Sequence, residues 1–411
     1  MANIGIIAEF NPFHNGHSYL IREAKAMAER ETGEEPGVVI CMSGNYVQRG
    51  SAAVFDKYLR AESALTDADC VFELPVLWAT ADAGNFAGCG VDLLRKTCII
   101  DFLAFGIEAS EENKDAVISS LNKAADILAE EPEGFKERLK ELLSAGQSYP
   151  AARQTALLEI SDIAPDTLST SNNILAIEYL TAIRKTGSNI KPVFVSRIGS
   201  GYNDTELNGS FSSATAIRES MKDTDLREYI PAEALDVIEP FTHFPILTEE
   251  YLMPYITSAM RNLSEQELLS IRGMNEDLLG RLMKAPLPSS FSELADYMKT
   301  RNVTMTRIRR LLLSLALGIK KSDLLPAGRI TSPNYINLLA MRKDASQIVK
   351  AVSESEELTV INKKSSYRPE DALSELSWFT DIRTTDIYNQ MFYTCTGEKL
   401  PKELRSNIRL R

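Results

Sequence analysis

The chain has 411 residues, of which 44% are hydrophobic and 25% are charged, and its formal net charge is −12. This composition is typical of a soluble globular protein and excludes a disordered or fibrous chain, while the length favours two domains. The negative charge excludes nucleic-acid binding driven by overall charge, although it leaves room for a local basic face.

The N-terminal stretch "MANIGIIAEF" lacks the basic region and the cleavage site of a signal peptide, and no apolar run is long enough to cross a bilayer. We therefore expect a cytoplasmic protein without a membrane partner. The five cysteines include no CxxC pair. We expect them to be buried thiols rather than parts of a disulfide framework or a zinc site.

The first 225 or so residues alternate short apolar runs with helical patterns, which predicts an α/β fold with a parallel, doubly wound sheet. The runs are continuous, as expected of strands covered on both faces, and they are 3–10, 37–42, 70–75, 101–106 and 191–197. Helices are predicted over 16–30, 55–67, 81–96, 112–143 and 172–186. The segment 107–160 is rich in Glu, Lys and Ala, which predicts a helical insertion.

A domain boundary is predicted after residue 225, where Pro231, Pro240 and Pro245 interrupt the periodicity. Residues 247–320 show helical spacing. After Pro333 a strand, a helix and a strand are predicted, followed by a helix over 370–393. We therefore predict one domain over 1–225, containing the insertion, and a helical and mixed α/β domain over 226–411.

The sequence His14-Asn15-Gly16-His17 follows the first predicted strand and opens the first predicted helix. A helix start at the carboxyl end of a parallel strand offers unpaired N–H groups and a partial positive charge, which favour a phosphate. Two imidazoles there can donate hydrogen bonds to phosphate oxygens as charge builds on them. They would be transition-state stabilisers, because four residues supply neither a carboxylate nor a third zinc ligand. The alternative is that one histidine caps the helix and the other packs in the core.

A second motif, "FSSATAIRESM" over 211–221, places Ser212, Ser213 and Thr215 ahead of a helical run that carries Arg218. Hydroxyls and free N–H groups at this helix start could hold the terminal phosphates of a nucleotide, and Arg218 could neutralise them. Taken alone, the same residues form an ordinary helix N-cap.

Together the two motifs resemble the HxGH and SSTxIR pair of the nucleotidyltransferase superfamily, which implies a Rossmann-like domain and attack on the α-phosphate of ATP or CTP. Ala214 stands where that superfamily often has serine. The chain is also similar to the bacterial tRNA(Met) cytidine acetate ligase family. The blocks that carry this similarity are "GIIAEFNPFHNGHSYLI", "MSGNYVQRGSAAVFDKYLRAESAL", "FELP", "SNNILAIEYL" and "SRIGSGYND".

The narrower resemblance implies that ATP and acetate give acetyl-adenylate. The acetyl group then passes to N4 of the wobble cytidine of elongator tRNA(Met), giving N4-acetylcytidine. It implies Mg²⁺ and the catalytic residues His14, His17 and Arg218. The implied ATP site comprises Ile7, Ala8, Glu9, Phe10, Asn11, Pro12, Phe13, His14, Asn15, Gly16, His17, Ser18, Tyr19, Leu20, Gly106, Asn172, Asn173, Arg197, Ile198, Ser213, Thr215 and Arg218.

Some of these residues also have simpler interpretations. Gly106 is compatible with a strand-end turn, the two asparagines with helix N-caps, and Arg197 with a surface charge. The polar loop 43–51 places Gln48 and Arg49 where they could contact the acyl-adenylate or the incoming nucleotide, or belong to a mobile solvated loop.

The segment 299–321 contains basic but no acidic residues. It is either a tRNA-contacting face or a solvated helix surface. The candidate tRNA-binding residues are Arg307, Arg309, Arg310, Lys320 and Lys321.

Two other functions are compatible with both motifs. One is a nucleotidyltransferase that moves a nucleotide from ATP or CTP to a small phosphorylated acceptor, which would require further cationic groups near the α-phosphate. The other is a nucleotide-sensing RNA-binding module, which would bind ATP without releasing pyrophosphate. The oligomeric state is not indicated by the sequence.

Overall fold

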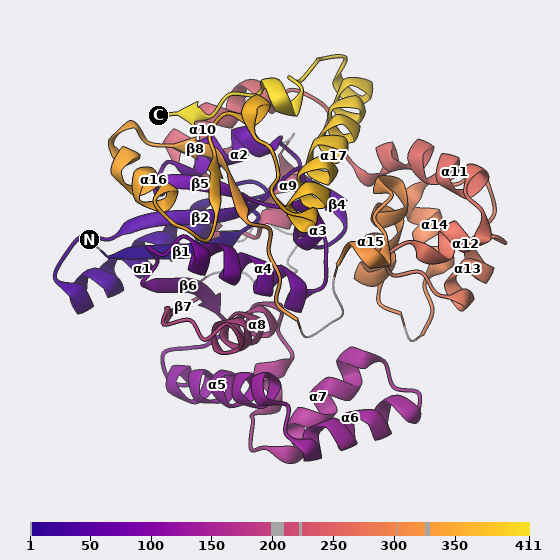
Figure 1. The fold of residues 1–411 in the computed structure, drawn as a ribbon, viewed down its shortest axis with the longest axis horizontal. Coiled ribbons are helices and arrows are strands. Elements are labelled where there is room, and N and C mark those ends of the chain that lie inside the picture. Colours follow the sequence, from indigo (N-terminus) through magenta and orange to yellow (C-terminus); the bar gives the residue numbers. More distant parts are fainter. Residues whose placement is uncertain (1, 199–208, 222–223, 302, 325–328) are drawn as a thin grey trace.

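The computed structural model describes residues 2–198, 209–221, 224–301, 303–324 and 329–411. Residues 199–204 of the block "SRIGSGYND" and Asn302 of the basic segment lie outside the described residues. A central sheet with helices on both faces organises the chain, and two helical groups project from it (Figure 1).

The sheet contains five parallel strands in the order β5-β2-β1-β6-β7. They are β1 (Asn3–Ala8), β2 (Gly37–Ser43), β5 (Cys70–Leu74), β6 (Phe102–Ile107) and β7 (Lys191–Ser196). The predicted strands and the doubly wound α/β architecture are confirmed. The strand order changes direction between β1 and β6, and ligands bind at such a point in open α/β sheets.

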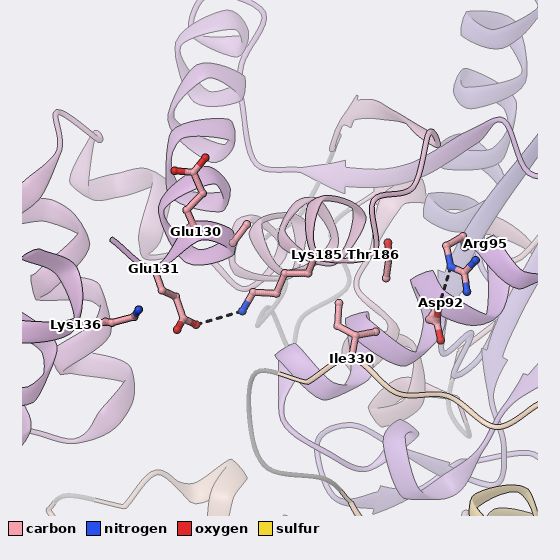
Figure 2. A pocket seen from close by; sticks show the side chains of 9 residues that line it. Asp92, Arg95, Glu130, Glu131, Lys136, Lys185, Thr186 and Ile330 are labelled. Carbon is pink, nitrogen blue, oxygen red and sulfur yellow. Dashed lines mark hydrogen bonds and ion pairs between the residues drawn. The ribbon is translucent and has the colours of Figure 1, made fainter. Parts of the chain in front are cut away.

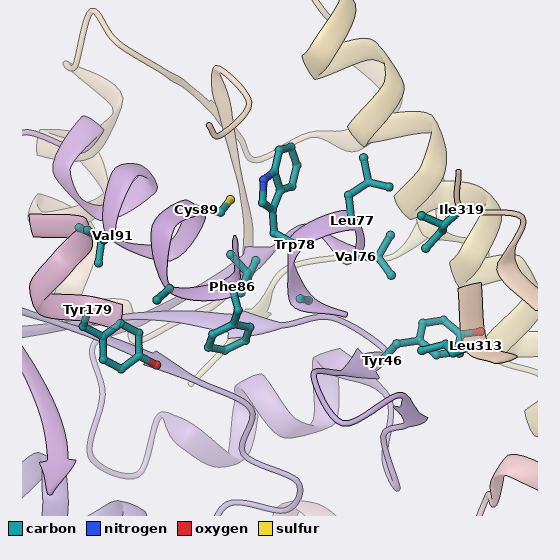
Figure 3. Close-up of a cluster of buried hydrophobic side chains, with 14 of the residues drawn as sticks. Tyr46, Val76, Leu77, Trp78, Phe86, Cys89, Val91, Tyr179, Leu313 and Ile319 are labelled. Carbon is teal, nitrogen blue, oxygen red and sulfur yellow. The ribbon is translucent and has the colours of Figure 1, made fainter. Parts of the chain in front are cut away.

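Helices cover both faces because side chains alternate along each strand. In β2, Val38 packs in a cluster that includes side chains of α1, whereas Val39 packs in the cluster that includes α4. Figure 3 shows part of the second cluster, where Trp78 and Phe86 are buried. The main covering helices are α1 (Asn15–Thr32), α2 (Lys57–Ala64), α3 (Val76–Ala79), α4 (Ala83–Lys96) and α8 (Ser171–Lys185).

The predicted insertion is helical and lies below the sheet in Figure 1. It comprises α5 (Lys114–Glu130), α6 (Glu133–Ser144) and α7 (Tyr149–Ile160). The predicted helical layer also forms. Its main helices are α11 (Met253–Asn262), α12 (Glu265–Ser270), α13 (Glu276–Leu282), α14 (Phe291–Met298) and α15 (Met305–Leu317). Two short helices precede this layer, α9 (Ala214–Ser220) and α10 (Ala232–Ile238).

The last part of the chain returns to the N-terminal sheet. Strand β8 (Tyr335–Met341) pairs antiparallel with β5, and both β9 (Thr359–Ile361) and β10 (Arg409–Leu410) pair with β8. The accompanying helices are α16 (Ser346–Ser353) and α17 (Ala372–Thr396). The sequence places these strands in a second domain over 226–411, but in space they extend the sheet of the first.

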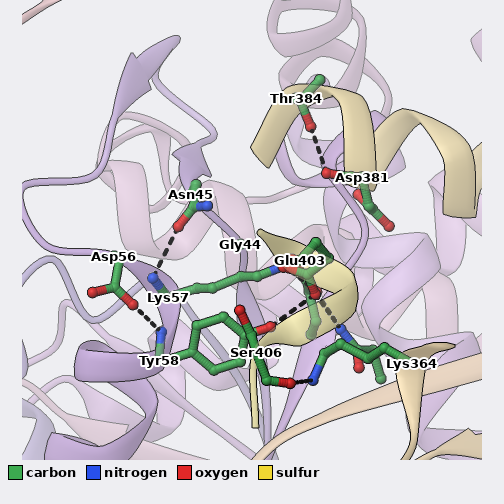
Figure 4. A network of polar contacts seen from close by, with 12 residues as sticks. Gly44, Asn45, Asp56, Lys57, Tyr58, Lys364, Asp381, Thr384, Glu403 and Ser406 are labelled. Carbon is green, nitrogen blue, oxygen red and sulfur yellow. Dashed lines mark hydrogen bonds and ion pairs between the residues drawn. The ribbon is translucent and has the colours of Figure 1, made fainter. Parts of the chain in front are cut away.

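A buried ionic cluster fastens this returning segment (Figure 4). The Lys57 ammonium lies 2.7 Å from Glu73 Oε1 and 3.0 Å from Glu403 Oε2, and Tyr58 donates to Glu403 at 2.8 Å. Burial lowers the pKa of Lys57, but Glu403 and Glu73 outweigh it, so the pKa lies above its ordinary value. The ammonium therefore stays charged and holds residue 403 to the start of α2.

The cysteine prediction is confirmed for Cys41, Cys70 and Cys89, which are buried free thiols, but it is wrong for Cys98, which is exposed. Cys98 follows the end of α4 with φ 59°. Its side chain lies outside the core because the turn after the helix runs along the surface. Cys395 is half-buried.

Candidate active site

A cavity of about 240 Å³ lies at the carboxyl ends of the central strands. Its wall combines the loop after β1, the start of α1, α8, the end of β7 and the start of α9. The predicted ATP-site residues that line it are Ile7, Ala8, Glu9, Phe10, Asn11, His14, Gly16, His17, Tyr19, Leu20, Gly106, Asn172, Arg197, Ile198, Ser213, Thr215 and Arg218. Segments separated by some 200 residues thus meet at one site, as the pairing of the two motifs predicts.

Five predicted residues lie behind this wall: Pro12, Phe13, Asn15, Ser18 and Asn173. Phe13 is 1% exposed, and its ring lies against that of His17. Asn15 joins the helix start to residues on either side of the second motif, because its Nδ2 donates to the carbonyls of Ser210 at 3.1 Å and Glu228 at 2.8 Å. These contacts support the cavity from outside.

The two histidines are held by the backbone of the first turn of α1. Nδ1 of His14 accepts from the Gly16 N–H at 3.0 Å, and Nδ1 of His17 accepts from the His14 N–H at 3.3 Å. A neutral imidazole that accepts at Nδ1 carries its proton on Nε2. The capping role left open by the sequence is therefore present, and it leaves each ring with an Nε2–H donor.

Gly16 makes this arrangement possible, because a Cβ at this position would lie 2.8 Å from Cε1 of His14. The ring centroids of His14 and His17 are 3.9 Å apart. The side chain of any other residue would therefore displace the ring that caps the helix.

Both imidazoles are neutral in the folded chain. Burial, followed by the charges of Arg197 and Arg218, lowers the pKa of His14 to about 3. Burial, followed by His14 and Arg197, lowers the pKa of His17 well below its ordinary value. Neutral donors beside two guanidinium groups form a site suited to an anion with several oxygens.

Arg218 connects the two motifs directly. It donates to the carbonyl of Asn11 at 2.6 Å and to Oγ1 of Thr215 at 3.1 Å. Ser213 is the N-cap of α9, and its Oγ accepts from the Ala216 N–H at 3.0 Å. The helix that carries Arg218 is thus fixed against the loop that leads to His14.

The residues at the end of β6 have roles that the sequence left open. A Cβ at Gly106 would lie 3.3 Å from Cγ of Arg197, so the absence of a side chain at Gly106 leaves room for the Arg197 side chain in the cavity wall. Asn173 Oδ1 accepts from the Glu108 N–H at 2.9 Å, and Asn172 Nδ2 donates to the Glu108 carboxylate at 2.7 Å. The N-cap interpretation of the asparagines is wrong, because α8 is preceded by Thr170 as its N-cap. They hold the chain just after β6.

The polar loop 43–51 is a packed hairpin formed by β3 (Tyr46–Val47) and β4 (Ser51–Ala52), rather than a solvated loop. Gln48 and Arg49 line the cavity, and the Gln48 N–H donates to Glu9 Oε1 at 2.7 Å. Gly50 has φ +86°, and a Cβ there would lie 2.6 Å from the backbone carbon of Arg309. Helix α15 therefore supports the hairpin from behind.

Arg60 holds the strand ends beneath this hairpin. Its buried guanidinium donates to the carbonyls of Phe55 at 3.0 Å, Glu9 at 2.5 Å and Ser43 at 3.1 Å, and also to that of Gly44. One side chain thus joins the ends of β1 and β2. No pattern in the sequence predicted this role of Arg60.

An apolar part of the wall was not predicted from the sequence. It includes Val47, Phe86, Leu175, Tyr179, Val195, Phe211 and Ala214, with Ser51 and Ser196 beside them, and it adjoins Ser212 of the second motif. Asn172, Leu175 and Tyr179 share one face of α8, since they stand at positions i, i+3 and i+7. Counting this spacing from Asn172 could have identified Leu175 and Tyr179 as wall residues from the sequence. Phe86 and Phe211 have no comparable local signal.

The candidate tRNA-binding residues lie outside the cavity wall and differ in exposure. Arg307, Lys320 and Lys321 are exposed. Arg309 pairs with Glu249 at 3.2 Å, and burial lowers the pKa of the Arg310 guanidinium. Among the five candidates, the exposed three are therefore the cations available to a partner.

A wider groove of about 640 Å³ lies near the C-terminal ends of α4 and α8, and hence at the opposite end of the sheet (Figure 2). Its charged residues are largely paired: Lys185 with Glu131 at 3.2 Å and Arg95 with Asp92 at 3.0 Å. Parallel sheets bind ligands at the carboxyl ends of their strands, so position and chemistry favour the smaller cavity.

Among the described residues, no helix is both long and apolar enough to cross a membrane.

Comparison with known proteins gives consistent matches over nearly the whole chain. A family model described as HIGH Nucleotidyl Transferase matches residues 1–403. The tRNA(Met) cytidine acetate ligase of Acetivibrio thermocellus is 32% identical over 99% of this chain and 99% of its own length. That of Caldanaerobacter subterraneus subsp. tengcongensis is 35% identical over 97% of this chain and 98% of its own.

Solved structures also match. The crystal structure of Thermotoga maritima TmcAL in its apo form has a TM-score of 0.88 at 29% identity and covers 100% of this chain and 99% of its own. The structure of the same protein bound with alpha-thio ATP has a TM-score of 0.86 at 28% identity, with the same coverage.

Proposed function

Because this chain belongs to the HIGH nucleotidyl transferase family, and within it to the tRNA(Met) cytidine acetate ligases, we propose that it is an ATP-dependent acetate ligase acting on tRNA. It forms acetyl-adenylate and transfers the acetyl group to N4 of the wobble cytidine of elongator tRNA(Met), giving N4-acetylcytidine. The observation that carries the proposal is the meeting of both phosphate-binding motifs at one cavity. A cytoplasmic location follows from the substrate.

In the first step an acetate oxygen attacks the α-phosphorus of ATP and pyrophosphate leaves. The Nε2–H groups of His14 and His17 donate to phosphate oxygens as negative charge builds on them. Arg218, near Ser213 and Thr215, neutralises the pyrophosphate. The relative bound with alpha-thio ATP supports ATP as the nucleotide.

We infer that Mg²⁺ enters with ATP. Among the described residues, no group of three or more His, Cys, Asp or Glu side chains could hold a metal ion. Magnesium is commonly held by substrate phosphates and water with few protein ligands, so the phosphates of ATP would hold it here. When bound, it would offset phosphate charge, and the chain's own residues orient the nucleotide.

The second step requires tRNA, and the C-terminal part of the chain, residues 226–411, supplies a candidate platform. Helix α15 contacts the hairpin that carries Gln48 and Arg49 into the cavity wall. The exposed cations Arg307, Lys320 and Lys321 lie at the two ends of this helix. Phosphate contacts of this kind position a nucleic acid without reading its sequence.

The test measures pyrophosphate release from ATP with and without acetate, and follows radiolabelled acetate into purified tRNA. Release that depends on acetate, followed by label in N4-acetylcytidine, is the expected result. Release without acetate and no label in RNA would favour nucleotide transfer to a small phosphorylated acceptor. ATP binding without release would favour a nucleotide sensor.

His17→Ala should abolish acetate-dependent pyrophosphate release, because it removes one phosphate donor. His243→Ala is the matched control, since His243 is exposed and lies outside the cavity wall. Circular dichroism checks that both variants fold. Full activity of folded His17→Ala would contradict the phosphate-site assignment.

A further inference from the structure

The second half-reaction of the proposed function requires a proton acceptor, and the following inference rests on that function. N4 of cytosine attacks the carbonyl carbon of acetyl-adenylate, forming a C–N bond. The bond from this carbon to the phosphate oxygen breaks, and AMP leaves with the electron pair. N4 must lose one proton, because the product is a neutral amide. A base within reach of N4 accelerates such a step.

Few described residues in the cavity wall can take up that proton. Each histidine, His14 and His17, uses Nδ1 to accept a backbone N–H, and its pKa is lowered. Burial raises the pKa of the Tyr19 hydroxyl, and the arginines remain protonated. Glu9 is the only carboxylate among the described residues that line the cavity.

We propose that the Glu9 carboxylate accepts the N4 proton during acetyl transfer and passes it to solvent. Its position supports this role. Oε1 accepts from the Gln48 N–H at 2.7 Å, and the Glu9 carbonyl accepts from Arg60 at 2.5 Å. Oε2 takes part in no hydrogen bond or ion pair with the described residues. The carboxylate is thus anchored through one oxygen and keeps the other for the substrate.

The hairpin that anchors Glu9 also places this carboxylate beside the incoming nucleotide. Gln48 and Arg49, predicted to contact that nucleotide, line the same wall. The hydrogen bond from the Gln48 N–H to Glu9 therefore joins this hairpin to the proposed proton acceptor. Binding of tRNA against α15 would hold this hairpin, since Gly50 packs against the backbone of α15.

The surroundings make Glu9 a stronger base than an ordinary carboxylate. Burial raises its pKa, while the Gln48 N–H and the charges of Arg218, Arg49 and Arg60 lower it, and burial prevails. The histidines of α1 are neutral, and Arg197 of the wall adds a further cation. A carboxylate whose pKa moves towards neutrality accepts a proton more effectively at physiological pH.

The experiment isolates transfer from adenylate formation. Synthetic acetyl-adenylate and unmodified elongator tRNA(Met) are supplied, and N4-acetylcytidine is measured by mass spectrometry in single turnovers. Glu9→Gln should slow transfer by about 10²- to 10⁴-fold, the usual contribution of a general base. The wild-type transfer rate should rise with pH as a carboxylate ionises, which gives the pH–rate profile an acidic limb. This acidic limb should be absent in Glu9→Gln. Glu29→Gln, which changes an exposed carboxylate on α1, is the matched control.

Three results would overturn the inference: transfer by Glu9→Gln at the wild-type rate, persistence of the acidic limb in that variant, or restoration of its rate by excess Mg²⁺. The last would make Glu9 a metal-binding group. If Glu9→Gln does not fold, Glu9→Asp decides the matter. Its shorter carboxylate should slow transfer and shift the acidic limb of the pH–rate profile to a different pH. An unchanged rate and an unchanged profile would refute the assignment. Wild-type protein that makes no N4-acetylcytidine would instead refute the proposed function.

Discussion

Replacing His14 with asparagine should make the folded chain less sensitive to acid. Asparagine is a favoured N-cap, so the cap is kept while the imidazole is lost. The folded chain keeps His14 neutral with a pKa of about 3, against an ordinary value of 6.5. Below about pH 6.5 the unfolded chain takes up a proton that the folded chain does not, so stability falls by about 1.4 kcal/mol per pH unit. At about pH 5 this amounts to about 2 kcal/mol.

Urea unfolding followed by tryptophan fluorescence at about pH 7.5 and pH 5 measures this difference, since Trp78 is buried in the core. Wild-type protein should lose about 2 kcal/mol more stability on acidification than His14→Asn. His243→Asn, which removes the exposed third histidine, should lose as much as the wild type. Parallel losses in wild type and His14→Asn would refute the burial of a neutral imidazole at the helix start.

Three further variants test contacts elsewhere. Lys57→Met leaves Glu73 and Glu403 buried without their cation and should lower the free energy of unfolding in urea by about 3–5 kcal/mol. Lys123→Met, which removes an exposed ion pair, should leave the urea midpoint nearly unchanged. Equal shifts of the midpoint in the two variants would contradict this. Arg307→Glu combined with Lys321→Glu should weaken tRNA binding and flatten its salt dependence while acetate-dependent pyrophosphate release persists; unchanged affinity would make this a solvated surface. Gly50→Ala, at φ +86° against the backbone of α15, should destabilise the chain by at least about 1 kcal/mol in the same unfolding assay, whereas a neutral effect would contradict the close packing.

Several features of the site could be predicted from the sequence because they depend on neighbouring residues. Continuous apolar runs identified the five parallel strands, and the position of His14 to His17 between a strand and a helix predicted a phosphate site at the place where the cavity lies. The second motif was located in the same way, by hydroxyls before a helical run. The order of these elements along the chain also predicts a doubly wound sheet, whose strand ends form one edge.

Other features depend on which distant segments meet. The sequence assigned β8 to a separate domain because its apolar pattern does not specify a partner, whereas in the folded chain it pairs with β5. Likewise, basic residues along α15 look equivalent in the sequence, yet packing covers Arg310 in part and leaves Arg307 exposed.

The strands, the helix starts and the candidate phosphate-binding motifs could be recognised in the sequence, since backbone propensity, periodicity and capping act over a few residues. The folded chain was needed to show that Arg60 joins the strand ends and that Gln48 anchors Glu9. It was also needed to show that Phe86 and Phe211 line the cavity. These contacts span long stretches of chain, and burial at such positions is set by the packing of whole elements rather than by local pattern.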